Sequence, residues 1–303
     1  MQWIFLFLFS MLLCTHSSAQ EVPVEGSVIK GNLIIGRSTF ALPPGDWKVV
    51  LTSTETVSIN NLPAGASSAS VYLVQQDTDG AYIASIWHNV PLASTFTKSW
   101  TDPLCNRKDT LYRDSFSGRF DFPECLLINH KVGFWLNVPV NANDRKIWEW
   151  YAANKIKLPL TVLTGSYRKY FAGDYVNVEV TINPEYFGQD KSLKSVWVES
   201  EWHPLIIKND LKRLDYLENF KKWLYVMVNN ASATLKDRKP KLSLLPALDE
   251  FNGALTKVSS DLNNKLEIIS IEQRLLNLKV LFDKGLISKE QFDAKQIAII
   301  KAL

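Results

Sequence analysis

Histidine and cysteine are scarce in this sequence. Its 303 residues include only 4 His and 3 Cys. Three of the histidines, His88, His130 and His203, stand far apart, and none belongs to an HxH or HExxH pattern of the kind that binds zinc. A GxSxG motif, which would hold the nucleophile of an α/β hydrolase, is absent as well. The sequence therefore predicts no catalytic residue, no metal ligand and no cofactor.

An excess of charge of one sign is also lacking. The 34 Lys and Arg residues against 31 Asp and Glu give a formal net charge of +3. This charge is too small and too dispersed for the basic stripe of a nucleic-acid-binding protein. A composition of 46% hydrophobic and 21% charged residues is typical of a folded globular chain. At this length we expect one main domain and an appendage.

Two patterns approach functional motifs without meeting their requirements. The stretch 31–38, GNLIIGRS, is close to the phosphate loop GxxxxGK[ST], but Arg37 replaces the lysine and bulky residues at 33–35 would crowd the backbone cradle. A strand flanked by glycines is the better interpretation. Glu199 and Glu201 could face one way from a strand as a glycosidase pair does, although solvated acid pairs are far more common on surfaces.

The apolar run near the start of the chain is too short for a membrane span. Residues 4–13 are almost all apolar, whereas a spanning helix needs about 20 such residues. Polar residues and then Ala19 follow, which predicts a signal peptide over residues 1–19. Leu13 before Cys14 is bulky where a bacterial lipoprotein signal has a small residue. We therefore expect an exported protein of the periplasm, the cell envelope or the medium, with no transmembrane anchor after signal cleavage.

Two cysteines, Cys105 and Cys125, remain beyond this segment. In an oxidising compartment an even count at this spacing predicts one disulfide. Closing a loop of about 20 residues would stabilise the fold by roughly 3 kcal/mol on the chain-entropy model. A redox or metal pair would call for a CxxC spacing, which the sequence lacks.

Short apolar or alternating runs between turn residues are typical of residues 22–141 and predict a β-rich domain. A helix over 143–155 interrupts them, with Asn143 as its cap and Ile147, Trp148 and Tyr151 on one face. A longer helix is expected over 204–235, where apolar residues recur at spacings of three and four. The expected strands are 47–52, 70–75, 81–88, 131–138, 160–164, 175–182 and 195–199.

The predicted fold class is α+β. An antiparallel β-rich main domain with a long helix precedes a C-terminal α-helical hairpin. Basic residues and two prolines mark a linker between them, and an a/d rhythm from Leu248 to Leu262 predicts a further packed helix. The expected division is a signal peptide at 1–19, an exported domain at 20–235, a linker at 236–247 and a helical region at 248–303 with the hairpin at 271–303.

The hairpin at the end of the chain is the most specific pattern. Its first helix stops at Gly285, because glycine suits the left-handed position after a helix C-terminus. Ser288 and Gln291 then offer a capping box for the second helix, and Ile287 and Phe292 a hydrophobic staple. The expected interaction residues of the hairpin are Leu275, Leu278, Phe282, Gly285, Ile287, Ser288, Phe292 and Ile297.

The segment 275–300, LLNLKVLFDKGLISKEQFDAKQIAII, resembles the short C-terminal domain (SHOCT) family. Gln291 stands where that family more often has Glu, which keeps the capping role without the charge. The resemblance covers about a tenth of the chain. Because SHOCT modules are attached to many unrelated domains, it implies an interaction or oligomerisation role and no particular chemistry. The matching positions are Leu278, Leu281, Gly285, Leu286, Ile287, Ser288, Phe292, Ala294 and Lys295.

Aromatic residues crowd the region 148–202. Aromatic faces can stack on sugar rings or seat a lipid, and packing of a sheet against a helix explains most of them equally well. The candidate ligand aromatics are Trp148, Tyr151, Trp197 and Trp202.

Together these patterns favour an exported non-enzymatic protein whose hairpin mediates oligomerisation or binding to another envelope protein. Two alternatives stay open. One is an exported hydrolase that acts on envelope polymers, which a pocket gathering His88, His130 or His203 with acids would favour. The other is a carbohydrate- or lipid-binding module, which a flat exposed aromatic face would favour.

Deletion of residues 271–303 tests the role of the hairpin. A hairpin of about 30 residues without a disulfide or a metal buries too little surface to be stable alone, so its apolar face should dock on a partner or on its own chain. We expect the truncated protein to lose either mass, measured by light scattering, or thermal stability. A truncated protein that keeps both would contradict the association role.

Overall fold

The computed structural model describes residues 22–59, 62–92, 103–117, 123–133, 139, 141–171, 174–236, 242–252, 275, 278–279, 282–283 and 288–300. The chain divides into two compact units, Met1–Asp249 and Glu250–Leu303, which are considered separately below. None of the helices that these residues form combines the length and the apolar character that a bilayer crossing requires.

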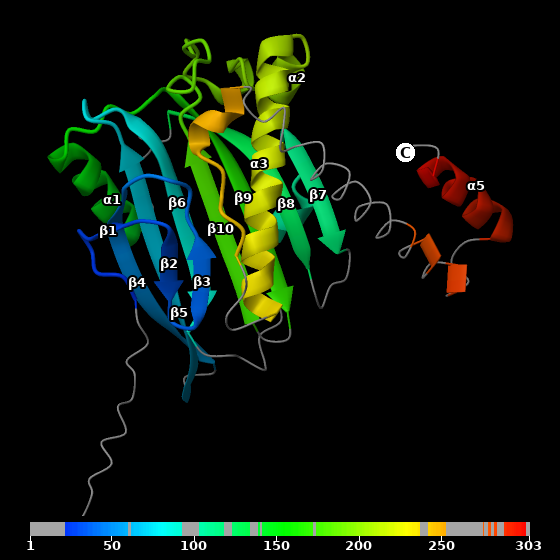
Figure 1. Ribbon diagram of the computed structural model, residues 1–303, viewed down its shortest axis with the longest axis horizontal. Coiled ribbons are helices and arrows are strands. Elements are labelled where there is room, and N and C mark those ends of the chain that lie inside the picture. The colour runs from blue at the N-terminus through cyan, green and yellow to red at the C-terminus, as the bar shows by residue number, and fades with distance from the viewer. Residues whose placement is uncertain are drawn as a thin grey trace, which may run out of the picture. The chain divides into compact units, whose positions relative to one another are not determined.

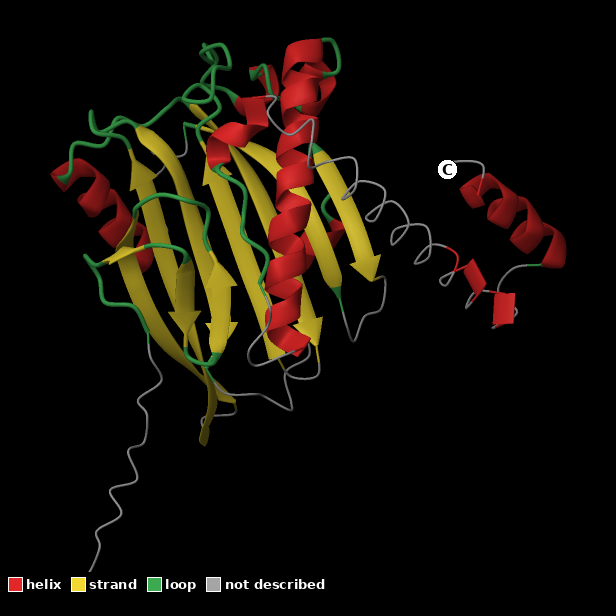
Figure 2. Ribbon diagram, viewed as in Figure 1, coloured by secondary structure: helices red, strands yellow, loops and turns green. Residues whose placement is uncertain are grey.

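An eight-stranded sheet dominates the first unit (Figures 1 and 2). Its strand order is β1-β4-β5-β6-β10-β9-β8-β7, and every neighbouring pair is antiparallel. The predicted α+β class with an antiparallel sheet is therefore confirmed. The strands are β1 (Val28–Ile29), β4 (Trp47–Ile59), β5 (Leu62–Gln76), β6 (Tyr82–Pro91), β7 (Tyr112–Ser117), β8 (Glu124–Val132), β9 (Thr161–Phe171) and β10 (Asp174–Ile182).

One face of this sheet is apolar and covered. Helix α3 (Leu211–Lys236) contacts β9 and β10, and the hairpin of β2 (Asn32–Ile35) and β3 (Ser38–Ala41) lies beside the helix on the same face (Figure 1). Gly36, with φ +57°, forms the hairpin turn, and Arg37 is ion-paired with Asp174 on β10. The stretch that approached a phosphate loop is thus a β-hairpin. Buried side chains under this cover include Val71, Leu73, Ile86, Leu126, Ile128, Leu163, Tyr167, Val176, Val178 and Val180.

Gly165 allows α3 to approach the sheet closely. A Cβ atom at this position of β9 would lie 2.4 Å from Cδ1 and 3.0 Å from Cγ of Leu224. Leu224 itself is fully buried in the middle of α3. The missing side chain of Gly165 therefore makes the space that the leucine fills, because buried atoms pack at near-crystalline density.

Helix α1 (Ala142–Ala153) lies on the opposite side of the sheet, against β4. Its cap is Asn141, whose Oδ1 accepts a hydrogen bond from the Asp144 backbone N–H at 2.9 Å. The expectation of Asn143 as cap was wrong by two residues, because both asparagines suit the role and only the helix start decides between them. Tyr151 and Ile147 pack against Val50 and Val74 of the sheet.

Several expected elements differ in the structure. The strand expected at 131–138 overlaps only the end of β8, which stops at Val132, and residues 134–138 lie outside the described residues. The helix expected from Leu248 to Leu262 begins as a 3-10 helix, Leu248–Asn252, and residues 253–262 lie outside the described residues.

Residues 197–199 form a 3-10 turn, Trp197–Glu199, in place of the strand expected at 195–199. The helix expected over 204–235 is divided into α2 (Pro204–Ile207) and α3. Asp210 causes the break, because its carboxylate accepts a hydrogen bond from the Arg213 backbone N–H at 3.0 Å and so starts a new helix.

The predicted disulfide between Cys105 and Cys125 is confirmed, with Cα atoms 5.7 Å apart. It joins a 3-10 turn at Pro103–Asn106 to strand β8. The segment between the two cysteines contains the edge strand β7, which pairs with β8.

The residues expected to form a linker, 236–247, are described again from residue 242, where they pack along α3. Asn230 donates a hydrogen bond to the Ser243 carbonyl at 2.7 Å and accepts one from its N–H at 2.8 Å. The Trp223 indole donates to the carbonyl of Pro246 at 3.0 Å. Leu245 and Leu248 are buried.

In the second unit, α5 (Lys289–Ile300) is the longest described helix. The capping box expected at its start is confirmed, because the Gln291 N–H donates to Ser288 Oγ at 3.3 Å and the Ser288 N–H donates to Gln291 Oε1 at 3.0 Å. The rings of Phe282 and Phe292 are 4.8 Å apart between centroids. Leu278 is buried, Leu275 half-buried and Ile297 exposed, while Gly285 and Ile287 lie outside the described residues.

Replacement of Gly165 by alanine tests the close approach of α3. The added methyl group would overlap Leu224, and we expect G165A to lower the free energy of unfolding by about 1 to 3 kcal/mol, as overpacking does. In an L224A background the same methyl group should enter a cavity and destabilise much less. Urea unfolding of the two single variants and the double variant measures the coupling. If the losses of unfolding free energy in the two single variants simply add in the double variant, Gly165 is not what allows the close approach of α3.

Candidate functional site

The face of the sheet opposite α3 is polar along its middle strands. Side chains alternate between the faces of a strand, so residues paired across neighbouring strands share a face. Tyr72, Trp87, Glu179 and Ser166 are successive partners across β5, β6, β10 and β9. A second row runs through Ser70, Asn89, Asn177 and Arg168. We call this surface the polar face.

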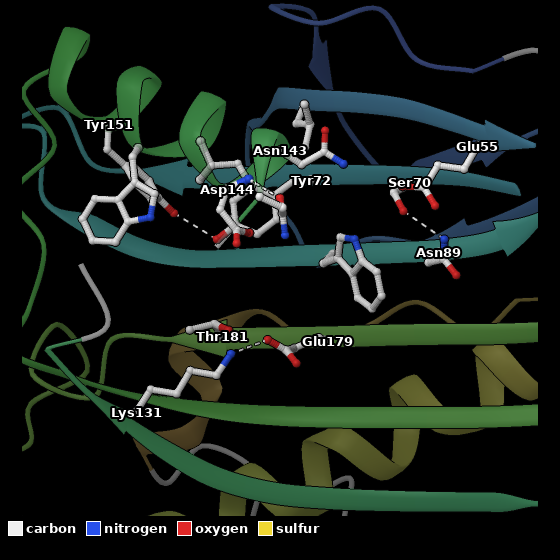
Figure 3. A pocket seen from close by; sticks show the side chains of 15 residues that line it. Glu55, Ser70, Tyr72, Asn89, Lys131, Asn143, Asp144, Tyr151, Glu179 and Thr181 are labelled. Carbon is white, nitrogen blue, oxygen red and sulfur yellow. Dashed lines mark hydrogen bonds and ion pairs between the residues drawn. The ribbon is translucent and has the colours of Figure 1, made fainter. Parts of the chain in front are cut away.

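A cavity of about 480 Å³ lies between the polar face and α1 (Figure 3). The helix supplies one wall through Asn143, Asp144, Ile147, Trp148 and Tyr151. The remaining lining comes from the helix cap Asn141, from the four neighbouring strands β4, β5, β6 and β10, and from β8. These strand residues are Leu51, Glu55, Ser70, Tyr72, Trp87, Asn89, Lys131, Glu179 and Thr181.

A buried hydroxyl network joins α1 to the floor of this cavity. The Tyr72 hydroxyl lies 2.8 Å from Ser85 Oγ and 3.0 Å from the Tyr151 hydroxyl. The Tyr82 hydroxyl also donates to Ser85 Oγ at 2.8 Å. Burial raises the pKa of Tyr72, and it raises those of Tyr82 and Tyr151 well above their ordinary value. All three phenols are therefore neutral at pH 7.

Amide and hydroxyl groups form a hydrogen-bonded row at the other end of the cavity. Asn89 donates to Ser70 Oγ at 2.9 Å and accepts from the Asn177 amide at 3.3 Å. Asn177 is 5% exposed, and its Oδ1 has no hydrogen-bond partner among the described residues. A buried acceptor without a partner is costly unless a ligand or water satisfies it.

Lys131 and Glu179 form an ion pair on the polar face, with Lys131 Nζ 2.6 Å from Glu179 Oε1. Ser166 Oγ donates to the other carboxylate oxygen at 3.0 Å. Burial alone would raise the pKa of Glu179, but the charge of Lys131 and these hydrogen bonds outweigh it and hold the pKa below its ordinary value. Figure 3 shows Lys131 reaching from β8 toward Glu179 and Thr181 on β10.

A second cavity of about 350 Å³ shares Lys131 and Glu179 with the first. Arg107 lines it from beyond the disulfide-linked turn, and Arg168 lines it from β9. Trp197 closes one side, stacked on His130 with ring centroids 5.2 Å apart. Burial lowers the pKa of His130 to about 4, so its ring is neutral at pH 7.

The candidate aromatics separate in three dimensions. Trp148 and Tyr151 line the first cavity and Trp197 lines the second. Trp202 lines neither, because it is fully buried against Tyr216 and the Arg213 guanidinium. The polar side chains of both cavities had no motif to reveal them. Their only sequence signal is the polar residue at every second position of strands β5, β6, β9 and β10, as in Ser70 and Tyr72 or Asn177, Glu179 and Thr181.

The histidines do not meet at one site with acids. His88 is buried on the covered face against Phe40, with ring centroids 4.5 Å apart, and burial lowers its pKa to about 3. His130 and His203 both contact the Trp197 ring, and His203 Nδ1 caps α2. Within the described part of the chain, no three His, Cys, Asp or Glu side chains are grouped to hold a metal ion.

The ion pair predicts a specific pH dependence. Because the pKa of Glu179 is lowered on folding, its charge stabilises the native state above its unfolded pKa near 4.5, and this contribution disappears as the pH falls through the folded pKa. We expect E179Q to lower the free energy of unfolding by at most about 1 kcal/mol at pH 7, since the pair is partly exposed. The gap to the wild type should narrow as the pH falls below 4.5 and through the lowered pKa of Glu179.

Urea unfolding at several pH values measures this gap. D190N, which removes the more exposed Lys212–Asp190 pair, is the matched control and should change little at any pH. A gap for E179Q that stays constant down to pH 3 would contradict the assigned role of the carboxylate.

Comparison with known proteins does not identify a function for either cavity. No protein-family model matches the chain, and a search of curated proteins finds no match. Any function for the two cavities therefore rests on their own geometry.

Proposed function

We propose that this chain is an exported, non-enzymatic protein that binds a carbohydrate on the polar face of its sheet. The C-terminal hairpin then associates with a second copy or with another envelope protein. The observation that carries the binding role is the first cavity, which combines half-buried aromatic rings with a row of fixed hydrogen-bonding groups. A sheet face that is only exposed to solvent would need neither the half-buried aromatic rings nor the fixed hydrogen-bonding groups.

The chemistry of the first cavity suits a sugar ring. Sugars present apolar C–H faces and rings of hydroxyl groups, so their sites pair aromatic surfaces with amides and carboxylates. Here Trp87 and Trp148 are half-buried at the cavity. Asn89 and Ser70 form a hydrogen-bonded floor, and the unpartnered Oδ1 of Asn177 adjoins this row.

Hydrolysis has weaker support from this geometry. Glu55 on β4 and Glu179 on β10 both line the first cavity, but β5 and β6 lie between their strands. Three strand spacings alone put their backbones roughly 14 Å apart, and the register sets them four residues apart along β6 as well. The two carboxyl groups of a glycosidase are only about 5 to 9.5 Å apart. The lowered pKa of Glu179 is also the opposite of what a general acid needs.

Export and association rest on other features. The disulfide Cys105–Cys125 suits an oxidising compartment such as the periplasm or the cell exterior. The hairpin resembles SHOCT modules, and its second helix has the expected capping box. A unit of this size needs a surface on which to dock.

Carbohydrate binding is tested on an array of neutral and acidic cell-surface glycans with the protein from residue 22 onward. We expect binding to a subset of the glycans. W87A should weaken it about tenfold, because loss of one stacking ring removes roughly 1 to 1.5 kcal/mol. Y186A is the matched control, since Tyr186 is 43% exposed and lines neither cavity.

Thermal melting of each variant separates lost binding from lost folding. Equal weakening by W87A and Y186A would place binding elsewhere. An array without any bound glycan would refute the proposed function itself.

A further inference from the structure

Exposed aliphatic side chains are concentrated where the chain passes from β10 to α3. This connection spans residues 183–210, and Figure 1 shows it at the end of the sheet where α3 begins. More than half of the large aliphatic side chains that are exposed among the described residues lie in the connection or directly after it. We call this group the apolar tip, and its members are Leu193, Val196, Val198, Leu205, Ile206 and Leu211.

The side chains of the apolar tip protrude into solvent. Leu211 is 82% exposed, Leu193 is 78% exposed and Leu205 is 67% exposed. The tip lines neither of the two cavities. Single exposed apolar residues are ordinary on a protein surface, whereas a group of them on one short stretch of chain indicates contact with an apolar partner.

Buried residues between the exposed ones fix the connection to the domain. Trp202 is fully buried, with its ring 5.9 Å from that of Tyr216 on α3 and 5.6 Å from the Arg213 guanidinium carbon. Phe187 and Ile207 are each 3% exposed. The connection therefore displays its exposed aliphatic side chains from an anchored backbone.

The parts of the connection also contact one another. The Leu193 backbone N–H donates a hydrogen bond to Glu201 Oε1 at 3.3 Å. Lys212 at the start of α3 is ion-paired with Asp190, with Lys212 Nζ 3.1 Å from Asp190 Oδ1. These contacts hold the first half of the connection, its second half and the start of α3 together, so the apolar tip forms one surface.

Three lysines accompany the apolar tip. Lys191, Lys194 and Lys208 are exposed. Within the described part of the chain, none of the three forms an ion pair or a side-chain hydrogen bond. Their charges are therefore available to a partner outside the chain.

Most acidic side chains of the connection are engaged within the protein. Both aspartates are ion-paired, one with Lys212 and the other with Arg213. Glu185 and Glu201 are half-buried and accept hydrogen bonds from backbone N–H groups. Among the described residues of the connection, Glu199 is the one exposed acid without such a contact. The unpaired surface charge beside the tip is therefore positive.

This composition favours a lipid bilayer over a protein partner. Protein interfaces are enriched in aromatic residues, methionine and arginine, and depleted in lysine. The apolar tip combines leucine, valine and isoleucine with lysine. Apolar side chains that enter the headgroup region, beside lysines that reach lipid phosphates, are the usual means by which a protein attaches to the surface of an anionic membrane.

We propose that the apolar tip docks on the surface of an anionic phospholipid bilayer. Its aliphatic side chains enter the headgroup region, and Lys191, Lys194 and Lys208 lie beside lipid phosphates. The stems of these lysines add apolar contact while their ammonium groups stay in the polar layer. The proposal does not rest on the carbohydrate role, because the tip lines neither cavity.

Cosedimentation with vesicles tests this docking, with the protein from residue 22 onward. Vesicles of phosphatidylglycerol mixed with phosphatidylcholine are compared with vesicles of phosphatidylcholine alone. We expect binding to the anionic vesicles to be roughly tenfold tighter, because the lysines are attracted to a negative surface. Added salt should weaken this binding by screening the charges.

A first pair of substitutions removes apolar contact. L205S/L211S should weaken binding to the anionic vesicles by roughly tenfold or more, because two leucine side chains no longer leave water. L244S is the control, since Leu244 is 93% exposed and lies outside the connection, and it should bind as the wild type does. All these positions are exposed, so the melting temperatures should match that of the wild type.

A second pair removes charge. K194Q/K208Q should weaken binding to the anionic vesicles by roughly fivefold or more and leave binding to phosphatidylcholine unchanged. K279Q/K295Q removes two exposed lysines from the second unit and is the matched control. A loss of binding in this control, with none in K194Q/K208Q, would assign the membrane contact to the second unit and overturn the proposal.

Other results would also overturn it. These are equal binding of both vesicle types, binding of neither, and anionic-vesicle binding that survives in both L205S/L211S and K194Q/K208Q. A lower mass of L205S/L211S in light scattering, with vesicle binding unchanged, would instead make the tip a contact between copies of the chain. Glycan binding by L205S/L211S should equal that of the wild type, so the failure of either proposal is distinguishable from the failure of the other.

Discussion

The structure of the first unit depends on a single antiparallel sheet that has one covered face and one polar face. Helix α3 and the β2–β3 hairpin bury the apolar side chains of β5, β6, β8, β9 and β10. The contact of Leu224 with the backbone at Gly165 lets the helix lie close enough to exclude water. Because antiparallel strands need only one buried face for stability, the opposite face is free to carry polar groups.

The candidate site lies on this polar face. Helix α1 covers only one end of the polar face, where Tyr151 and Val74 form a small second core, so a cavity remains over the adjoining strands. The tyrosine hydroxyl network holds α1 in place. The disulfide ties the 3-10 turn Pro103–Asn106, which precedes Arg107, to strand β8. The polar groups thus stand on strands and anchored segments, which is the kind of support that a selective binding site needs.

Much of the local structure could be predicted from the sequence. Patterns of neighbouring residues predicted the strands at 175–182 and 47–52 and the capping box at Ser288. They also predicted most of the helix α3, as the larger part of the helix expected at 204–235. The errors occurred where two local solutions compete. Asn141 and Asn143 are equally good caps, Asp210 interrupts an otherwise continuous apolar stripe, and residues 197–199 form a turn although their composition suits a strand.

The sequence by itself determined the disulfide, since only two cysteines follow the apolar N-terminal segment, and it determined which residues alternate along each strand. Only the tertiary structure decided which strands are neighbours. The pairing of β6 with β10 places Trp87 beside Glu179, and the pairing of β8 with β9 places Cys125 beside Arg168. The alternation of residues along a strand indicates the face on which each side chain lies. It does not indicate the neighbouring strand, because strand pairing depends on packing between segments far apart in the chain.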